Sequence, residues 1–207
     1  MYFLIGFLIL LFAVIIIFSF PQFSPIPYFP SNGKDIPLIL KALALKNNQT
    51  LIDLGAGDGI VILKAAEEAY TKKLNTQFIA VEINPVLLII LHIRRLLHPN
   101  RTNIQIVNRD MFTLSYSDLT NSTNLTNLTN LTNLTYYIYI SPWFIEKTVH
   151  NITKQVKTFD LVSYFYQVKC LPTYKEEVKE GVHKVYKYIC HSRGGGNPDS
   201  NNNIKSK

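Results

Sequence analysis

"LIDLGAGDG", residues Leu51 to Gly59, decides the fold, because an apolar run ends at an acid and the chain then turns through three glycines. The run predicts a short buried strand, and the residues after the turn have the spacing of a helix. Such a turn presents backbone N–H groups at a helix N-terminus, where a ligand can come close. Gly55 and Gly57 fit the dinucleotide pattern G-x-G-x-x-G, but Ile60 stands where its third glycine belongs. The stretch therefore predicts a ligand site without the register of a pyrophosphate loop.

Strands and helices alternate on both sides of this turn. Helical spacing covers residues 35–45, 60–70 and 85–97, and apolar runs predict strands at 50–54, 77–83, 103–110, 136–141 and 158–168. The alternation in "VHKVYKYI", residues 182–189, is typical of a late edge strand. The pattern predicts an α/β fold with a Rossmann-like sheet of about seven, mostly parallel strands. Ligands of such sheets bind at the carboxyl ends of the strands.

The composition divides the 207 residues into one domain and its appendages. We expect a transmembrane anchor over 1–20, a proline-rich spacer over 21–30, a folded domain over 31–190 and a disordered tail over 191–207. Within the domain, residues 121–135 repeat Asn-Leu-Thr and are interpreted as a mobile surface loop or, alternatively, a gate over the substrate side.

The first 20 residues carry no charged side chain and have the length of a membrane-crossing helix. No Lys or Arg precedes the apolar run and "FSFPQF" is a poor cleavage site, which favours a retained anchor over a signal peptide. Lys34, Lys41 and Lys46 follow the run, so we expect a single-pass membrane protein with its catalytic domain in the cytoplasm. The net charge is +7, but no run of Lys or Arg concentrates it, and we expect no specific nucleic-acid binding.

Acids end the next two strands. Glu82 lies 25 residues after Gly57, where a carboxylate can accept hydrogen bonds from both ribose hydroxyls of a nucleoside. Asp110 ends the third strand in "NRDMF". The pattern Asp53-x-Gly-x-Gly-x-Gly resembles motif I of the class I S-adenosylmethionine-dependent methyltransferases, whose pattern brings Asp110 or Met111 to the adenine. S-adenosyl-L-methionine is therefore the expected cofactor.

The fourth strand ends in "SPWF", which resembles the (Asp/Asn/Ser)-Pro-Pro-(Tyr/Phe) motif of methyltransferases acting on nitrogen. By that resemblance Ser141, Pro142, Trp143 and Phe144 would position the acceptor. An oxygen at Ser141 can orient an N–H group, and an aromatic face can hold an amine or its cation. The alternative is that Trp143 and Phe144 pack under the next helix.

Together, "IPYFPS", "LIDLGAGDG", "VEINPVLL" and "RDMF" resemble the membrane-anchored protein-lysine methyltransferase family that includes the ATP synthase c-subunit lysine methyltransferase. The resemblance implies N-methylation of a lysine or other amine on a protein, with membrane proteins among the acceptors. It also implies a cofactor site made of Pro30, Ser31, Asp53, Gly55, Ala56, Gly57, Gly59, Glu82, Ile83, Asn84, Asp110 and Met111. Ser141 and Trp143 depart from the family pattern, which leaves the acceptor open.

Two alternatives follow from the same motifs. The acceptor could be a lipid-like or small molecule, or the chain could be a degenerate cofactor-binding module with an interaction role. The helix over 85–97 could pack on the sheet or touch a bilayer through Arg94 and Arg95. The five histidines and two cysteines have no metal-ligand spacing, so we predict no metal site and free thiols. We expect a monomer.

Overall fold

The computed structural model describes residues 2–19, 27–115, 119, 133–171 and 176–191. Its helices are α1 (Tyr2–Ser19), α2 (Ile36–Leu43), α3 (Ile60–Thr71), α4 (Pro85–Leu96) and α6 (Pro142–Gln155), with short 3-10 helices η1 (Gly33–Asp35) and η2 (Arg101–Asn103). Its strands are β1 (Thr50–Leu54), β2 (Gln77–Glu82), β3 (Ile104–Asn108), β4 (Leu134–Ile138), β5 (Thr158–Tyr164), β6 (Glu176–Glu180) and β7 (Lys184–His191). Most of the Asn-Leu-Thr repeat and nearly all of the predicted tail lie outside the described residues.

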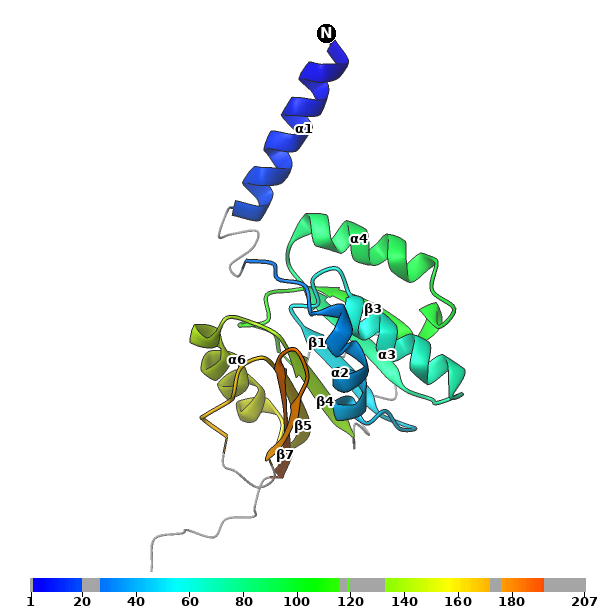
Figure 1. Cartoon of the computed structure of the whole chain (residues 1–207), viewed down its shortest axis with the longest axis vertical. Helices are drawn as coiled ribbons and strands as arrows, with labels where there is room; N and C mark the ends of the chain where they lie inside the picture. Colours follow the sequence, from blue (N-terminus) through cyan, green and yellow to red (C-terminus); the bar gives the residue numbers. More distant parts are fainter. Residues whose placement is uncertain (1, 20–26, 116–118, 120–132, 172–175, 192–207) are drawn as a thin grey trace, which may run out of the picture.

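The strands form one seven-stranded sheet in the order β3-β2-β1-β4-β5-β7-β6. Strands β1 to β5 run parallel, and β7 runs antiparallel to both β5 and β6. The predicted α/β sheet of mostly parallel strands is confirmed (Figure 1). The chain order reverses between β1 and β4, which creates a topological switch point where ligands of such sheets bind.

Two strand predictions need correction. The strand predicted at the edge is β7, which lies inside the sheet between β5 and β6. The true edge, β6, has the sequence "EEVKE", whose single apolar residue gave no strand signal. The fourth strand begins two residues earlier than expected, inside the repeat, because Leu134 and Thr135 are buried there. The Thr135 hydroxyl also accepts a hydrogen bond of 2.7 Å from the Gln49 side chain.

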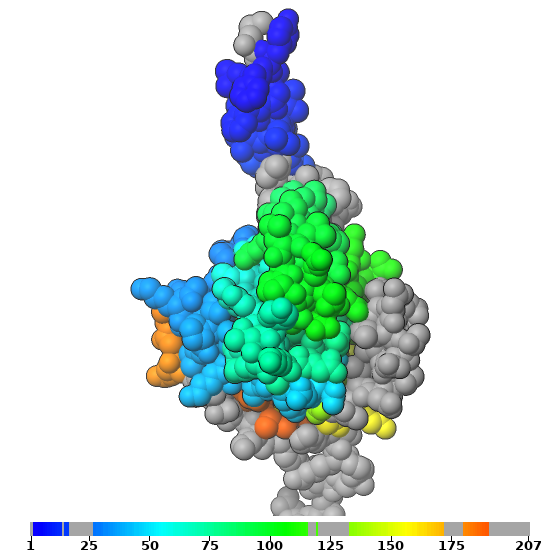
Figure 2. Space-filling view, turned by 90° about the vertical axis from the view of Figure 1, so that its right-hand side faces the viewer, coloured from blue at the N-terminus to red at the C-terminus, as the bar shows by residue number. Residues whose placement is uncertain are grey.

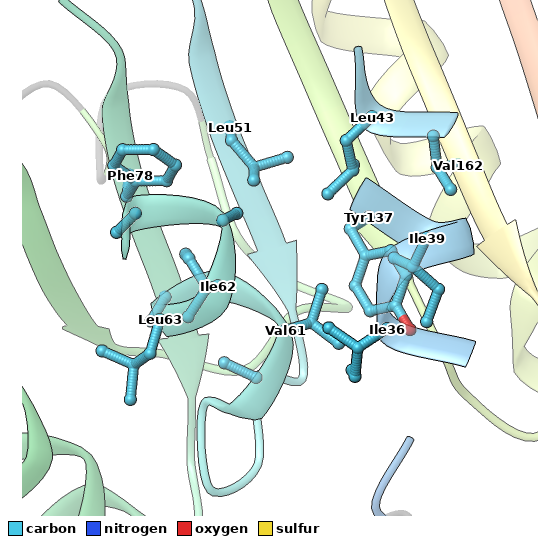
Figure 3. Packing of buried hydrophobic residues seen from close by; sticks show 14 of the residues in the cluster. Ile36, Ile39, Leu43, Leu51, Val61, Ile62, Leu63, Phe78, Tyr137 and Val162 are labelled. Atoms are coloured by element: carbon cyan, nitrogen blue, oxygen red, sulfur yellow. The ribbon is translucent and has the colours of Figure 1, made fainter. Parts of the chain in front are cut away.

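Helices cover both faces of the sheet. On one face α2 and α3 turn an apolar stripe inward, and Figure 3 shows Ile36, Ile39 and Leu43 of α2 beside Tyr137 and Val162 of the sheet. Alanines on α3 allow close packing on the strands; these are Ala65, Ala66 and Ala69. On the other face α6 packs through Ile145, Val149 and Ile152. The burial of these faces fixes the strand ends that carry the site.

The apolar N-terminus forms helix α1, which projects from the domain (Figure 1). Over the part of the chain that the structure describes, no helix has the length and hydropathy required to cross a membrane. The transmembrane helix predicted for residues 1–20 is therefore not found.

Candidate cofactor and acceptor site

A cleft opens at the carboxyl ends of β1, β2 and β4, beside the switch point. It encloses ≈ 690 Å³, its open mouth included, within the usual range for small-molecule sites. Ten of the twelve predicted cofactor residues line it: Pro30, Ser31, Asp53, Gly55, Ala56, Gly57, Glu82, Ile83, Asp110 and Met111. The fold thus brings together residues that are far apart in the sequence.

The glycine turn between β1 and α3 is held tightly against β2. The N–H groups of Gly55 and Ala56 both donate to the carbonyl oxygen of Val81 at 2.9 Å. Gly57 has a φ of +60°, and a Cβ there would lie 2.7 Å from Cε2 of Tyr28. Only glycine allows this left-handed backbone and this close approach together. At these glycines the surface of the cleft is therefore formed by backbone atoms.

Glu82, the last residue of β2, is a carboxylate held by backbone donors. Its Oε2 accepts the Gly57 N–H at 2.8 Å, and its Oε1 accepts the N–H groups of Ile83 and Asn84, each also at 2.8 Å. A carboxylate has about four acceptor positions, so one on Oε2 remains for a hydroxyl in the cleft. Burial raises the pKa of Glu82, opposed by those three backbone hydrogen bonds.

Asp53 lies in β1, one residue before its end, and is buried in the cleft wall. Burial, and the nearby charges of Glu82 and Asp58, hold the pKa of Asp53 well above its ordinary value. Its carboxyl group is therefore kept protonated more readily than that of an exposed aspartate. On the same wall the hydroxyls of Ser31 and Tyr137 share a hydrogen bond of 3.0 Å.

Gly59 and Asn84 do not line the cleft. Gly59 has a φ of +78°, and a Cβ there would collide with the Leu91 side chain of α4. The Asn84 side chain caps α4 by accepting the Val86 N–H at 2.9 Å. Both residues shape the helices around the cleft, Gly59 through close packing on α4 and Asn84 as the cap of α4, and their roles toward the cofactor stay predictions.

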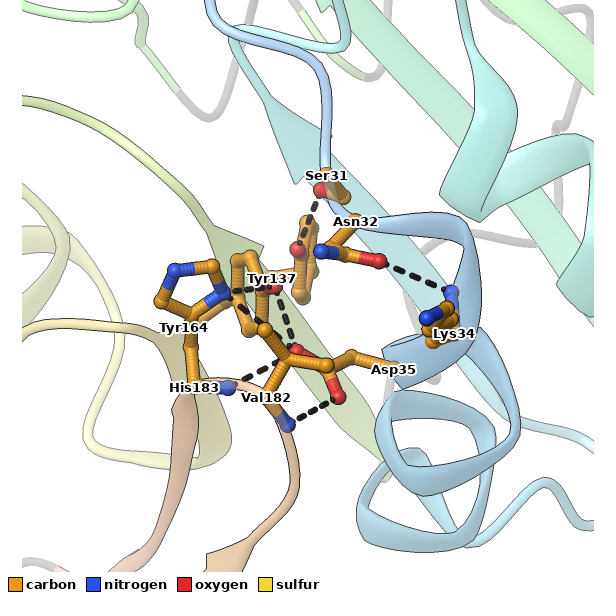
Figure 4. A network of polar contacts seen from close by, with 8 residues as sticks. All are labelled: Ser31, Asn32, Lys34, Asp35, Tyr137, Tyr164, Val182 and His183. Atoms are coloured by element: carbon orange, nitrogen blue, oxygen red, sulfur yellow. Dashed lines mark hydrogen bonds and ion pairs between the residues drawn. The ribbon is translucent and has the colours of Figure 1, made fainter.

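The segment before α2 forms one wall of the cleft and is fixed to the far side of the sheet (Figure 4). The buried Asp35 carboxylate accepts the Tyr164 hydroxyl at 2.7 Å and the N–H groups of Val182 and His183 at 2.7 and 2.9 Å. Burial alone would raise the pKa of Asp35, but these hydrogen bonds lower it. Sequence reasoning missed this network, because Asp35 and Tyr164 are 129 positions apart and neither belongs to a motif.

The "SPWF" turn does not line the cleft. Trp143 is 83% exposed, and Phe144 packs on Phe112 with ring centroids 5.2 Å apart. The cleft is bounded on this side by Tyr139 and Ile140, which directly precede the turn. The predicted acceptor residues 141–144 therefore stand beside the cleft mouth at the start of α6.

The cleft residues fit a nucleoside that carries an amino acid. Glu82 keeps an acceptor for a ribose hydroxyl, and the glycine turn leaves room for close backbone approach. Ile83, Leu87 and Met111 supply an apolar surface for a base. With the mixed sheet and the glycine turn, these features define a class I S-adenosylmethionine-dependent methyltransferase.

A family comparison makes the assignment more specific. The model of the ribosomal RNA adenine dimethylase family matches residues 28–167, more than half of the chain. The chain belongs to this family and is a methyl-transferring enzyme with S-adenosylmethionine as its cofactor. The expected membership in the membrane-anchored protein-lysine methyltransferase family has no support from the comparisons. No curated protein matches the chain in sequence.

Solved structures agree on the fold. An RNA methyltransferase from Salinibacter ruber, in complex with S-adenosyl-L-homocysteine, is 18% identical with a TM-score of 0.61, covering 83% of this chain and 100% of its own. A SAM-dependent O-methyltransferase from Thermotoga maritima is 13% identical with a TM-score of 0.59, covering 82% and 69%. The 23S rRNA methyltransferase ErmE is 16% identical with a TM-score of 0.54, covering 79% and 70%. At these identities the likeness establishes the fold alone.

Proposed function

We propose that the chain transfers a methyl group to the side-chain amine of a lysine on a protein. The observation that supports this acceptor is the charge of the cleft. Four carboxyl side chains line it, those of Asp53, Asp58, Glu82 and Asp110, and no Lys, Arg or His is present among its described lining residues. Burial raises the pKa of Asp53 and Asp58 is paired with Arg94, so the negative potential of the cleft comes chiefly from Glu82 and Asp110. An acidic cleft attracts a cationic lysine and repels the phosphates of a nucleic acid.

When bound, S-adenosylmethionine supplies a methyl group on a positively charged sulfur. The attacking nitrogen must arrive in line and with a free electron pair, so a lysine must first release a proton to solvent water. Tyr139 lines the cleft where the acceptor would enter, and burial raises the pKa of its hydroxyl. That hydroxyl stays neutral at physiological pH and can orient an amine N–H. The Tyr139 ring, packed edge-on against Tyr164 at 4.8 Å, offers an aromatic face to the methylated cation.

A second acceptor, the exocyclic amine of adenine in RNA, is favoured by the family to which the chain belongs. The net charge of +7 would assist RNA binding on the outer surface. Both acceptors are amines, so the same in-line transfer serves either. The two differ in whether phosphates must approach the acidic cleft.

Transfer of labelled methyl groups distinguishes the two acceptors. The full chain is incubated with cell extract and methyl-labelled S-adenosylmethionine, and the products are divided between protease and ribonuclease digestion. We expect label in methyl-lysine after protein hydrolysis; label in N6-methyladenosine would establish the RNA acceptor instead. Glu82→Ala should abolish labelling, whereas Glu67→Ala, at an exposed position on α3, should not.

We also propose that residues 1–20 attach the chain to a membrane, with the domain in the cytoplasm. The apolar side chains of α1 support this proposal, because those described are exposed by 39% (Ile16) to 90% (Phe3). Such a surface is unfavourable in water. The full chain should float with vesicles in a density gradient; recovery only in the dense fractions would refute attachment.

A further inference from the structure

The outward face of α4 is an apolar surface on the domain itself. Five large side chains remain between 37% and 83% exposed and are here called the α4 outer face: Ile89, Ile90, Ile93, Leu96 and Leu97. The opposite side of the helix is buried through Leu87, Leu88 and Leu91. A surface helix of a water-soluble domain usually presents polar residues outward. α4 is therefore apolar on both sides.

The charged residues that α4 and the segment after it contribute are all arginines. Residues 83–109 contain four arginines and no Asp or Glu. Arg94 pairs with Asp58, and Arg95 donates to the carbonyl oxygen of Ile104. These two arginines hold α4 on the domain, which differs from the headgroup contact considered for them from sequence. Arg101, which follows the C-terminal end of α4, is exposed and adds a positive charge at that end of the face.

The position of α4 relates this face to α1. Contacts join α1 to α4, and Figure 1 shows the axis of α4 running across the direction in which α1 projects. Figure 2 shows α4, in green, at the surface directly below α1. The cofactor cleft opens at the carboxyl ends of β1 and β2, next to the start of α4. An apolar helix with cationic neighbours that lies across an anchor has the character of an interfacial helix.

We propose that the α4 outer face lies against an anionic lipid bilayer, so that the cleft opens at the membrane–water boundary and takes its acceptor there. The exposed Arg101 and the absence of Asp and Glu from residues 83–109 match anionic headgroups, and the five apolar side chains match the acyl boundary. The inference rests on the proposed membrane attachment by residues 1–20. It does not depend on whether the acceptor is a lysine or an adenine.

Fluorescence quenching in vesicles tests this contact. In the full chain Cys170 and Cys190 are replaced by serine, and one cysteine is introduced by Ile93→Cys or, as a matched control on α3, by Tyr70→Cys. The two positions are similarly exposed, at 53% and 56%. Each is labelled with a polarity-sensitive fluorophore and mixed with phosphatidylglycerol–phosphatidylcholine vesicles that contain a nitroxide-labelled lipid.

We expect the lipid nitroxide to quench about half of the fluorescence of the label at residue 93. The fluorescence of the label at residue 70 should not change. If the chain floats with the vesicles and neither label is quenched, α1 alone holds the membrane and the inference is wrong. If the chain does not float, the membrane attachment itself fails and the inference falls with it. Concentration-dependent shielding at residue 93 without vesicles would show that a second copy covers the face, which also overturns it.

Discussion

The Gly57 N–H donates to Oε2 of Glu82 at 2.8 Å and so joins the turn after β1 to the end of β2. The bond links the two sequence features that most strongly indicated the cofactor. It also orients the carboxylate, because Oε1 is fixed by two further N–H groups. Backbone and acid therefore form one preorganised unit at the switch point.

Replacing Glu82 by glutamine should weaken cofactor binding. The glutamine side chain replaces one carboxylate oxygen by an NH2 group, whereas the surrounding backbone groups are all N–H donors. One hydrogen bond is therefore lost, and a buried donor is left without an acceptor. We expect affinity for S-adenosylmethionine to fall by about 10- to 100-fold, or ~1.4–3 kcal/mol. Calorimetric titration measures this, with Glu67→Gln as the exposed control; equal affinities for both variants would contradict the assigned role of Glu82.

Gly57→Ala should damage the turn in two separable ways. The left-handed backbone costs about 1–2 kcal/mol for a residue with a Cβ, and the new methyl group would meet the Tyr28 ring at 2.7 Å. Urea unfolding should therefore show lower stability, and cofactor titration lower affinity. Adding Tyr28→Ala should relieve the collision but not the backbone strain. If the double variant had the same stability and cofactor affinity as Gly57→Ala, a collision with Tyr28 would not be the cause of the damage.

The sequence predicted the parts of the fold and site that rest on local patterns. The strand before Gly55 and the helix after Gly59 follow directly from apolar spacing, and ten of twelve proposed cofactor residues line one cleft. Gly59 and Asn84 were assigned to the cofactor by resemblance, and the structure adds that Gly59 packs against α4 and that Asn84 caps it. Those functions depend on a neighbouring helix, which a motif does not reveal.

Long-range features could not be predicted in this way. The Asp35–Tyr164 hydrogen bond joins positions 129 apart, and β6 lacks an apolar pattern because it pairs on one side only, with β7. Tyr139 directly follows β4 and lines the cleft, whereas the "SPWF" motif drew attention to residues 141–144. In each case the tertiary arrangement determines the role of the residue, and a single sequence carries no record of it.

Asp53→Asn should stabilise the chain increasingly as the pH rises. The unfolded chain loses the Asp53 proton near the ordinary pKa of about 4, whereas the folded chain retains it because the pKa is raised by burial. Folding then takes up a proton, so the wild-type stability falls as the pH rises from about 4 through the folded-state pKa. Asparagine removes this dependence. Urea titrations at several pH values measure the difference, and a constant difference would show that the Asp53 pKa is not raised.

Asp35→Asn should have the opposite pH profile. Hydrogen bonds from Tyr164, Val182 and His183 lower the Asp35 pKa, so its stabilising effect is present above the unfolded-state pKa and is lost as the pH falls through the folded-state value. We expect the variant to be less stable near neutral pH and to approach wild type in acid. Asp35→Ala, which leaves three donors without their acceptor, should cost about 3 kcal/mol. If Asp35→Asn were as stable as the wild type at neutral pH, the hydrogen bonds of Asp35 would not stabilise the cleft wall.

Trp143→Ala should weaken binding of the acceptor without changing stability or cofactor affinity. The side chain is 83% exposed and does not line the cleft, so stability should change by less than about 0.5 kcal/mol and cofactor affinity should be unchanged. An exposed aromatic face contributes about 0.5–1 kcal/mol to the binding of a cation, which corresponds to a two- to fivefold rise in the KM for a lysine acceptor with kcat preserved. Steady-state methylation of the identified acceptor measures this, with Tyr70→Ala as an exposed aromatic control on α3. If both variants retain the wild-type KM, Trp143 has no part in acceptor binding, and the aromatic contact to the acceptor falls to side chains that line the cleft, such as Tyr139.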